Sequence, residues 1–522
     1  KNFKIINDLL LEHKVIFFRD HPLSSEQHIA LAEKFGPLET HAYVQGLDEH
    51  PEIVRIVKGE EEKNQWGENW HSDVSYNTKP TKAVILKSIK ISDIQKLAIP
   101  ALISGVAEPI LSITDTIIVG NMPENATISL GAVGIVGSFI SMLIWVFGQT
   151  RSVIASIIAQ ALGQKKLKEV KDLPAQGILI IIFSSFLIIL LTYFNSEGLF
   201  KFYNASGNLL KFCVEYFNIR VWGLPFTLLT IGIFGIFRGL QNTYYPMIIA
   251  IVGTILNIVL DIILVYGVEG FINPMFIQGA AYASLLAQIS MAFLAVILLY
   301  KKTNIKLAVK FPFNRKIKSF MQMFGNLVIR TASLNVTLYF CNAFATKYGD
   351  EFIAAYTIAI NLWFLVAFII DGYSSAGTIL SGKLYGEKSY GVLMKFGKDL
   401  TKIGVKIGVI MCIIGFVFYY PLGRIFNNDP VVLQEFYNIF WIVLAMLPLC
   451  SIAFIFDGLY KGLGWMKDLR NVLLFSTFII FVPFVILFDH YELGLHGIFY
   501  AFTLWILSLI HISEPTRLLS IS

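Results

Sequence analysis

Charged residues are scarce in this chain. Asp, Glu, Lys and Arg together make up 15% of its 522 residues, whereas 55% are hydrophobic. Soluble domains usually carry about 25% charged residues, so this balance excludes a soluble protein overall and predicts a membrane protein with many spans. The net charge of +6 is modest, and no patch combines basic with aromatic residues, which excludes nucleic acid as the expected partner.

Cysteine is also rare, with only four in the chain. The four are far apart and lie in or beside apolar runs, so their spacing suggests neither a metal site nor a disulfide framework. The first twenty residues lack the clean apolar core of a secretory signal, because charges interrupt their apolar positions.

Residues 1–80 have the pattern of a soluble α/β segment. KVIFFRD and EIVRIVK predict strands, and SSEQHIALAEKFG between them predicts an amphipathic helix. In NWHSDVSY, His71 and Asp73 form an H-x-D pair. In an extended segment the two side chains point to the same side, as two ligands of a non-haem iron site would. A polar loop is the alternative interpretation of such an isolated pair.

VIFFRDHPLSSEQHIALAEKFGPLETH followed by NWHSDVSY resembles the N-terminal part of the TauD-type 2-oxoglutarate-dependent dioxygenases. The resemblance implies a jelly-roll fold and iron bound by His71, Asp73 and a second histidine downstream. The next histidine is His490, deep in the hydrophobic region. We therefore expect residues 1–80 to be a truncated, inactive fragment with a vestigial two-ligand metal site. Composition changes abruptly over residues 81–96, which predicts a seam between two unrelated genes.

Apolar runs long enough to cross a hydrocarbon core of about 30 Å predict twelve transmembrane helices. They are expected to begin near Ile94, Leu130, Ala175, Val221, Met247, Gly279, Phe320, Phe352, Ile403, Phe436, Val472 and Leu495. Lysine and arginine gather in the 2-3, 6-7, 8-9 and 10-11 connections and are missing from the 1-2, 5-6 and 11-12 connections. This alternation predicts a multi-pass protein of the cytoplasmic (inner) membrane with its N-terminus inside.

The two halves of the hydrophobic region repeat each other. SVIASIIAQALGQKK, from Ser152, matches SAGTILSGKLYGEKS, from Ser375, and FRGL matches YKGL at the same offset of 223 residues. The pattern predicts two six-helix lobes, 94–300 and 320–506, joined by a basic cytoplasmic linker, 301–319, and related by an axis along the membrane normal. The predicted fold is an all-α polytopic membrane protein preceded by a small incomplete α/β fragment.

Six motifs follow one another in the hydrophobic region: AEPILSITDTIIVG, AQALGQKK, FRGLQNTYYP, NIVLDIILVYG, GAAYAS and IIDGYSSAG. In this order, over residues 91–506, they resemble the MATE (multidrug and toxic compound extrusion) transporters, specifically the DinF-like branch. The resemblance implies an antiporter that brings protons or sodium inward and exports small organic, often cationic, compounds. No cofactor is expected, and the proton or sodium ion is transported as the coupling ion. The protein is expected to lie in the lipid bilayer without an obligate protein partner.

Carboxylates inside the predicted spans are the candidates for cation coupling, because ionisable groups in a membrane are costly and usually functional. Glu108 and Asp115 are two turns apart in the first span, and Asn257 and Asp261 are one turn apart in the fifth. The resemblance implies that Asp115, Asn257 and Asp261 form a cation site with the hydroxyl of Ser284, and it matches Glu108 to the E-P of the DinF-like branch.

Each of these candidates has an alternative. Asp115 could be merely interfacial, and Asp261 could cap a broken helix or bridge to Asn257. Glu108 and Ser284 could be structural. Asp371, near the end of the eighth span, is expected at a solvated helix end.

Two further residues are candidates for the substrate cavity. Arg330 in the seventh span either lines the cavity or pairs with an acid, and Trp145 either stacks on a cationic compound or anchors its helix. A lipid-precursor flippase of similar architecture is an alternative function, and it would require more cationic residues in the cavity than Arg330 alone. A membrane-tethered dioxygenase is another, and it would require the missing ligand.

The C-terminal residues 507–522, LSLIHISEPTRLLSIS, match no part of the MATE family and resemble a translated sequencing adapter. A natural polar tail is the alternative. The first residues of this tail are apolar and are expected to complete the twelfth helix.

Overall fold

The computed structural model describes residues 2–13, 16, 25–40, 46–47, 50–54, 85, 92–203, 205–427 and 429–512. The chain divides into two compact units, Lys1–Ile91 and Ser92–Ser522.

The first unit contains two helices and one small sheet. They are α1 (Asn2–His13), α2 (Ser25–Ala32) and the antiparallel pair β1 (Gly46–Leu47) and β2 (His50–Val54). The helix predicted in SSEQHIALAEKFG is confirmed as α2, and β2 overlaps the start of the strand predicted in EIVRIVK. Helix α1 was not predicted. The strand predicted in KVIFFRD lies outside the described residues except for Ile16.

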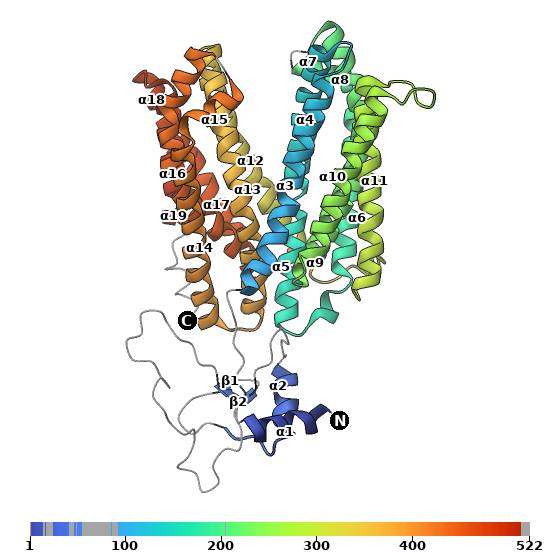
Figure 1. Ribbon diagram of the computed structural model, residues 1–522, viewed down its shortest axis with the longest axis vertical. Coiled ribbons are helices and arrows are strands. Elements are labelled where there is room, and N and C mark those ends of the chain that lie inside the picture. Colours follow the sequence, from blue (N-terminus) through green and yellow to red (C-terminus); the bar gives the residue numbers. More distant parts are fainter. Residues whose placement is uncertain are drawn as a thin grey trace. The chain divides into compact units, whose positions relative to one another are not determined.

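The second unit is helical throughout, as its composition predicts (Figure 1). Its elements are α3 (Ser92–Gly120), α4 (Ala126–Phe147), α5 (Thr150–Gly163), η1 (Leu167–Val170), α6 (Leu173–Tyr193), α7 (Ser196–Phe202), α8 (Gly207–Arg220), η2 (Val221–Gly223), α9 (Leu224–Gly239), α10 (Tyr244–Tyr266), α11 (Phe276–Lys302), α12 (Ile317–Tyr348), α13 (Asp350–Gly386), α14 (Tyr390–Val417), α15 (Tyr419–Phe426), α16 (Pro430–Leu463), α17 (Met466–Phe475), η3 (Ser476–Phe481), α18 (Val482–His490) and α19 (Gly494–Ile512).

Ten helical segments within the described residues are long and apolar enough to cross a membrane. Helices α3 and α12, with 29 and 32 residues, are also long enough, since a helix rises about 1.5 Å per residue. These twelve segments agree with the twelve predicted spans. The fourth and ninth begin well before their predicted starts, at Gly207 and Tyr390, because charged residues from Lys211 and Lys395 onward interrupt the apolar pattern before those starts.

The second unit forms two bundles that part at one end (Figure 1). We call α3–α11 the N-terminal bundle and α12–α19 the C-terminal bundle. Each has its own hydrophobic core, but α3 and α12 contribute to both. Phe320 and Phe324 at the start of α12 pack in the N-terminal core, whereas Ile94 and Leu97 at the start of α3 pack in the C-terminal core. These two helices therefore tie the bundles together.

The sequence repeat is also present in the packing. Within the N-terminal bundle, a side chain at Gly235 or Gly239 of α9 would meet carbonyl oxygens of α5. Within the C-terminal bundle, a side chain at Gly458 or Gly462 of α16 would meet carbonyl oxygens of α13. Glycines four residues apart let membrane helices approach closely. Each bundle thus uses the same helix contact at equivalent positions.

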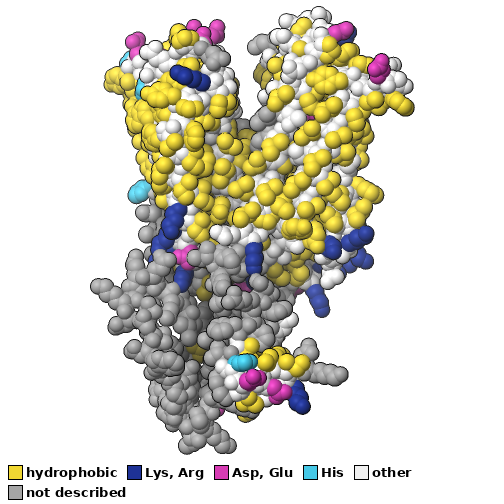
Figure 2. Space-filling model, viewed as in Figure 1, with side chains coloured by type: hydrophobic (Ala, Val, Ile, Leu, Met, Phe, Trp, Pro, Cys, Tyr) yellow, Lys and Arg dark blue, Asp and Glu magenta, His cyan; other side chains and the backbone are white. Residues whose placement is uncertain are grey.

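Lysines and arginines gather at one end of the second unit (Figure 2). This end, which we call the lysine-rich end, holds the connections α5–α6, α11–α12, α13–α14 and α16–α17. Here the bundles touch through α5, α13 and α16: Ser156 and Gln160 donate hydrogen bonds to the carbonyl of Gly462, at 3.1 and 2.8 Å. At the opposite end Figure 2 shows the unit hollowed between the bundles.

The C-terminal residues 507–512 continue α19, as expected, and the rest of the tail lies outside the described residues.

Candidate cation-coupling site

Four polar side chains meet inside the N-terminal bundle. Asp115 lies on α3, Asn257 and Asp261 lie on α10, and Ser284 lies on α11. All four are buried, with Asp115 6% exposed and Asp261 fully buried. The amide of Asn257 donates to Asp261 Oδ2 at 2.6 Å, and the Ser284 hydroxyl donates to Asp115 Oδ2 at 3.4 Å. Helix α3 therefore converges on these groups with the consecutive helices α10 and α11, which are distant from it in sequence.

The two carboxyl groups lie within hydrogen-bonding reach of each other. Asp115 Oδ1 and Asp261 Oδ1 are both buried and have no hydrogen-bond partner among the described residues. Two carboxylates this close repel each other unless a proton or a cation neutralises them. Carboxylate, amide and hydroxyl oxygens are also the ligands that hard cations prefer. The arrangement can therefore take up a proton or a sodium ion.

Arg220 is a charged neighbour of this site that the sequence did not reveal. It ends α8 and interacts electrostatically with both Asp115 and Asp261. Its Nη1 is buried without a hydrogen-bond partner among the described residues. The apolar run of the fourth span starts only at Val221, so Arg220 was placed in the preceding connection. Hydropathy could not have predicted that Arg220 lies inside the bundle.

Glu108 lies on α3, two turns before Asp115. Its side chain lies outside what the structure describes, so its predicted role stays a prediction.

Arg330 is paired with an acid, which was one of the two expectations for it. Its Nη2 lies 2.5 Å from Asp457 Oδ1 on α16, and Lys461 Nζ lies 2.7 Å from the other carboxylate oxygen. The three side chains are between 11% and 15% exposed. Because Asp457 binds both cations, this cluster leaves a single net positive charge inside the C-terminal bundle.

Trp145 lies where the two bundles face each other. Its ring packs against Phe364 of α13, with ring centroids 6.0 Å apart. Phe364 in turn packs against Phe368 on the next turn. Phe368 is the repeat equivalent of Trp145, so the two bundles contribute corresponding aromatic residues to this contact.

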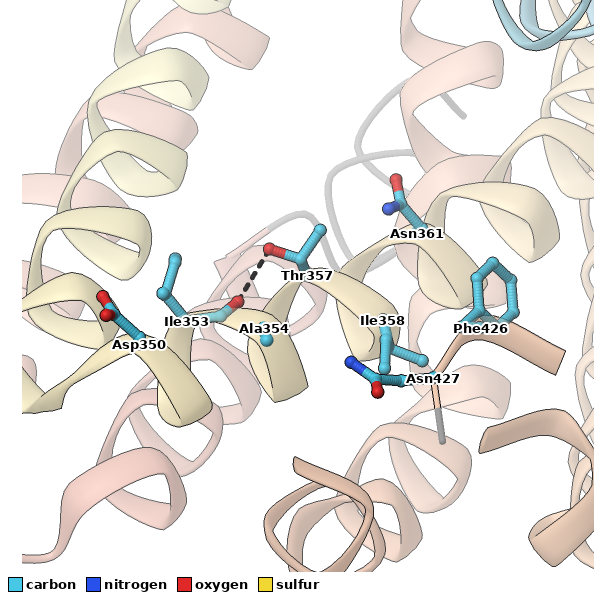
Figure 3. A pocket seen from close by; sticks show the side chains of 8 residues that line it. All are labelled: Asp350, Ile353, Ala354, Thr357, Ile358, Asn361, Phe426 and Asn427. Carbon is cyan, nitrogen blue, oxygen red and sulfur yellow. Dashed lines mark hydrogen bonds between the residues drawn. The ribbon is translucent and has the colours of Figure 1, made fainter. Parts of the chain in front are cut away.

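A separate cavity of about 340 Å³ lies between the start of α13 and the end of α15 (Figure 3). It is lined by Asp350, Ile353, Ala354, Thr357, Ile358, Asn361, Phe426 and Asn427. Thr357 uses its hydroxyl to donate to the carbonyl of Ile353 at 2.7 Å. The residues that line this cavity are distant in sequence from the buried carboxylates and include none of them.

The predicted iron ligands His71 and Asp73 lie outside the described residues. Within the described part of the chain, no group of three or more His, Cys, Asp or Glu residues could hold a metal ion.

Similarity to known proteins agrees with this architecture. The MatE family model matches residues 100–263 and 327–487, more than half of the chain. The model of the taurine catabolism dioxygenase TauD, TfdA family, matches residues 1–94.

Three curated relatives span most of the second unit. Protein DETOXIFICATION 45, chloroplastic, of Arabidopsis thaliana is 24% identical over 391 residues, which cover 70% of this chain and 68% of the relative. DNA damage-inducible protein F of Escherichia coli is 23% identical over 383 residues, covering 72% and 81%. The probable multidrug resistance protein NorM of Pasteurella multocida is 24% identical over 399 residues, covering 74% and 84%.

Solved structures share the fold. A crystal structure of MATE in the bent conformation superposes with a TM-score of 0.76 at 21% identity, covering 82% of this chain and 95% of that one. A MOP superfamily transporter from Pyrococcus furiosus, described as having a binding pocket of reverse polarity, gives a TM-score of 0.75 at 21% identity, covering 82% and 96%. The chain belongs to the MatE family of membrane transporters, and residues 1–94 add a TauD-like segment to it.

Proposed function

We propose that this protein is an antiporter that couples the entry of protons or sodium to the export of organic, cationic or amphipathic compounds. The observation that carries the proposal is the contact between Asp115 and Asp261, two buried carboxylates that each have an oxygen without a partner among the described residues. Two close, buried carboxylates bind a proton or sodium ion readily, because the cation neutralises their repulsion. They release it when a change in the bundle lets water reach the site, which is what a coupling site requires.

The proposed cycle is alternating access between the two lobes, 94–300 and 320–506, about the linker 301–319. If the lysine-rich end is cytoplasmic, as in an inner-membrane protein with its N-terminus inside, the bundles are closed inward and open outward. Binding of a cation by Asp115 and Asp261 would stabilise one arrangement of the bundles and lower the affinity for substrate. The substrate would then leave outward as the cation enters.

The aromatic contact between Trp145 and Phe364 supports an organic cation as the substrate. The two rings come from different bundles and meet where these face each other. Aromatic faces attract cations and apolar rings alike. Relatives carry names such as probable multidrug resistance protein, which fits this substrate class. Asp457 binds both Arg330 and Lys461, which weakens the alternative of an anionic lipid-linked substrate.

Transport by the purified full chain in vesicles tests the proposal. A fluorescent organic cation is offered outside the vesicles, and a proton or a sodium gradient is imposed separately. We expect one of the two gradients to drive accumulation of the dye and its dissipation to stop it. If neither gradient drives accumulation, while the same vesicles translocate a lipid-linked precursor, the protein is a flippase instead.

A further inference from the structure

A second, smaller polar cavity lies where the two bundles touch near the lysine-rich end. Its volume is about 20 Å³, room for one water-sized occupant. The N-terminal bundle contributes Arg151, Ser152 and Ala155 on α5 and Arg238 on α9, and the C-terminal bundle contributes Ser375, Thr378 and Ile379 on α13. The cavity therefore exists only while the bundles are in contact here.

Arg238 is the most deeply buried polar residue that lines this cavity, at 4% exposed. It donates through Nη1 to Ser375 Oγ at 2.9 Å and through Nη2 to Ser104 Oγ of α3 at 3.1 Å. Its Nε has no hydrogen-bond partner among the described residues. A buried charge is costly unless it is paired, and the two side chains that accept hydrogen bonds from this guanidinium among the described residues are neutral hydroxyls.

The charges around Arg238 do not balance among the residues whose side chains the structure describes. Arg151 repels Arg238 and Asp371 of α13 attracts it, so two positive groups face one negative group in this set. Asp371 is partly buried, which corrects the expectation that it lies at a solvated helix end. One additional negative charge would neutralise these three described groups.

The equivalent positions in the two halves differ in how their positive charge is neutralised. The equivalent of Arg238 in the C-terminal bundle is Lys461, which is neutralised by Asp457 one turn earlier on α16. At the position equivalent to Asp457, the N-terminal bundle has Phe234. Arg238 thus has no carboxylate at the corresponding place on its own helix.

We propose that this cavity binds a halide-sized monovalent anion, with chloride the commonest candidate. Guanidinium and hydroxyl groups are strong donors to anions, and a volume of about 20 Å³ suits a halide better than the larger sulfate or phosphate. Because both bundles supply the walls, bound anion stabilises the arrangement in which they touch at the lysine-rich end. The anion is thus a regulator of the transporter's conformation and differs from the coupling cation in site and charge.

Binding is tested on the purified full chain without any transport measurement. Chloride replaces gluconate at constant ionic strength, and the chlorine NMR line width and the unfolding temperature are followed. We expect saturable broadening and a saturable rise in unfolding temperature. In Arg151→Gln, whose side chain is only partly buried, we expect the apparent chloride affinity to fall at least about tenfold. The matched control is Lys168→Gln, which removes a positive charge from η1 outside the cavity and should titrate like the unaltered protein.

Three outcomes would overturn the proposal. One is an unaltered protein that responds identically to chloride and gluconate, which would make the cavity a water site. Another is Arg151→Gln with an undiminished chloride response. A third is an equal response to sulfate, which would indicate general screening of charge. Because the readouts are binding and stability, this result is independent of whether the chain exports organic cations.

Discussion

Gly163 and Gly386 occupy equivalent positions in the two halves, and each packs against a helix of the other half. A side chain at Gly163 would overlap the carbonyl of Lys383 on α13, and one at Gly386 would overlap the carbonyl of Gln160 on α5. Gln160 and Lys383 are themselves equivalent in the repeat. The contact is therefore two-fold symmetric, and the backbones are too close for any side chain between them.

Gly163→Ala should reduce transport at least about tenfold while the protein still folds and inserts. The new methyl group disfavours only the arrangement in which the bundles touch at the lysine-rich end, and overpacking of this kind typically costs about 1–3 kcal/mol. Gradient-driven dye uptake measures the effect. Gly134→Ala on α4 is the control, because nothing lies within 4 Å of the added carbon there. Equal uptake by the two variants would show that the glycine contact is dispensable.

Asp261→Asn should abolish growth under drug challenge while the protein still reaches the membrane. The substitution keeps the size of the side chain but leaves Asp115 as the one carboxylate among the four polar residues of the site. Growth and membrane abundance are measured together. Glu197→Gln on α7 is the control and should retain resistance, because Glu197 is exposed and is not part of the buried site. The hydrogen bond from Lys201 holds the pKa of Glu197 below its ordinary value. Full resistance in Asp261→Asn would exclude it from coupling.

The sequence predicted the helices well, because length and hydrophobicity are properties of each segment alone. It also predicted that Asn257 and Asp261 share a face, since four residues make about one turn. It could not show which helices touch. The approach of Asp115 to Asp261 is implied by the family resemblance alone, and the sequence does not identify the acid that pairs with Arg330.

The position of Arg220 also could not be predicted from the sequence. Hydropathy locates the apolar part of a span, whereas the helix that contains Arg220 begins fourteen residues before the predicted start at Val221. Long-range packing then brings this charge beside the carboxylates. Neither periodicity nor composition contains that information, because both describe only the local chain.

Arg220→Gln should raise the apparent affinity of the transporter for its coupling cation. Arg220 is a fixed positive charge near Asp115 and Asp261, so it competes electrostatically with any incoming cation. We expect about a tenfold change, which corresponds to about 1.4 kcal/mol. The measurement is the concentration of coupling ion that gives half-maximal dye uptake. Arg424→Gln on α15 is the control. An unchanged or lower affinity in Arg220→Gln would rule out this competition.

Asp457→Asn should lower the free energy of unfolding more than Asp489→Asn, which removes a partly exposed ion pair with Lys347. It leaves Arg330 and Lys461 as two uncompensated cations in the C-terminal bundle, and breaking a buried pair in this way typically costs about 3–5 kcal/mol. Unfolding of the purified protein in detergent measures the loss. The control is Asp489→Asn, because its partner Lys347 is 59% exposed and can be hydrated once unpaired, so a loss of at most about 1 kcal/mol is expected. Equal losses in the two variants would mean that water already reaches the Asp457 cluster, and Arg330 would then be available to line a wet cavity after all.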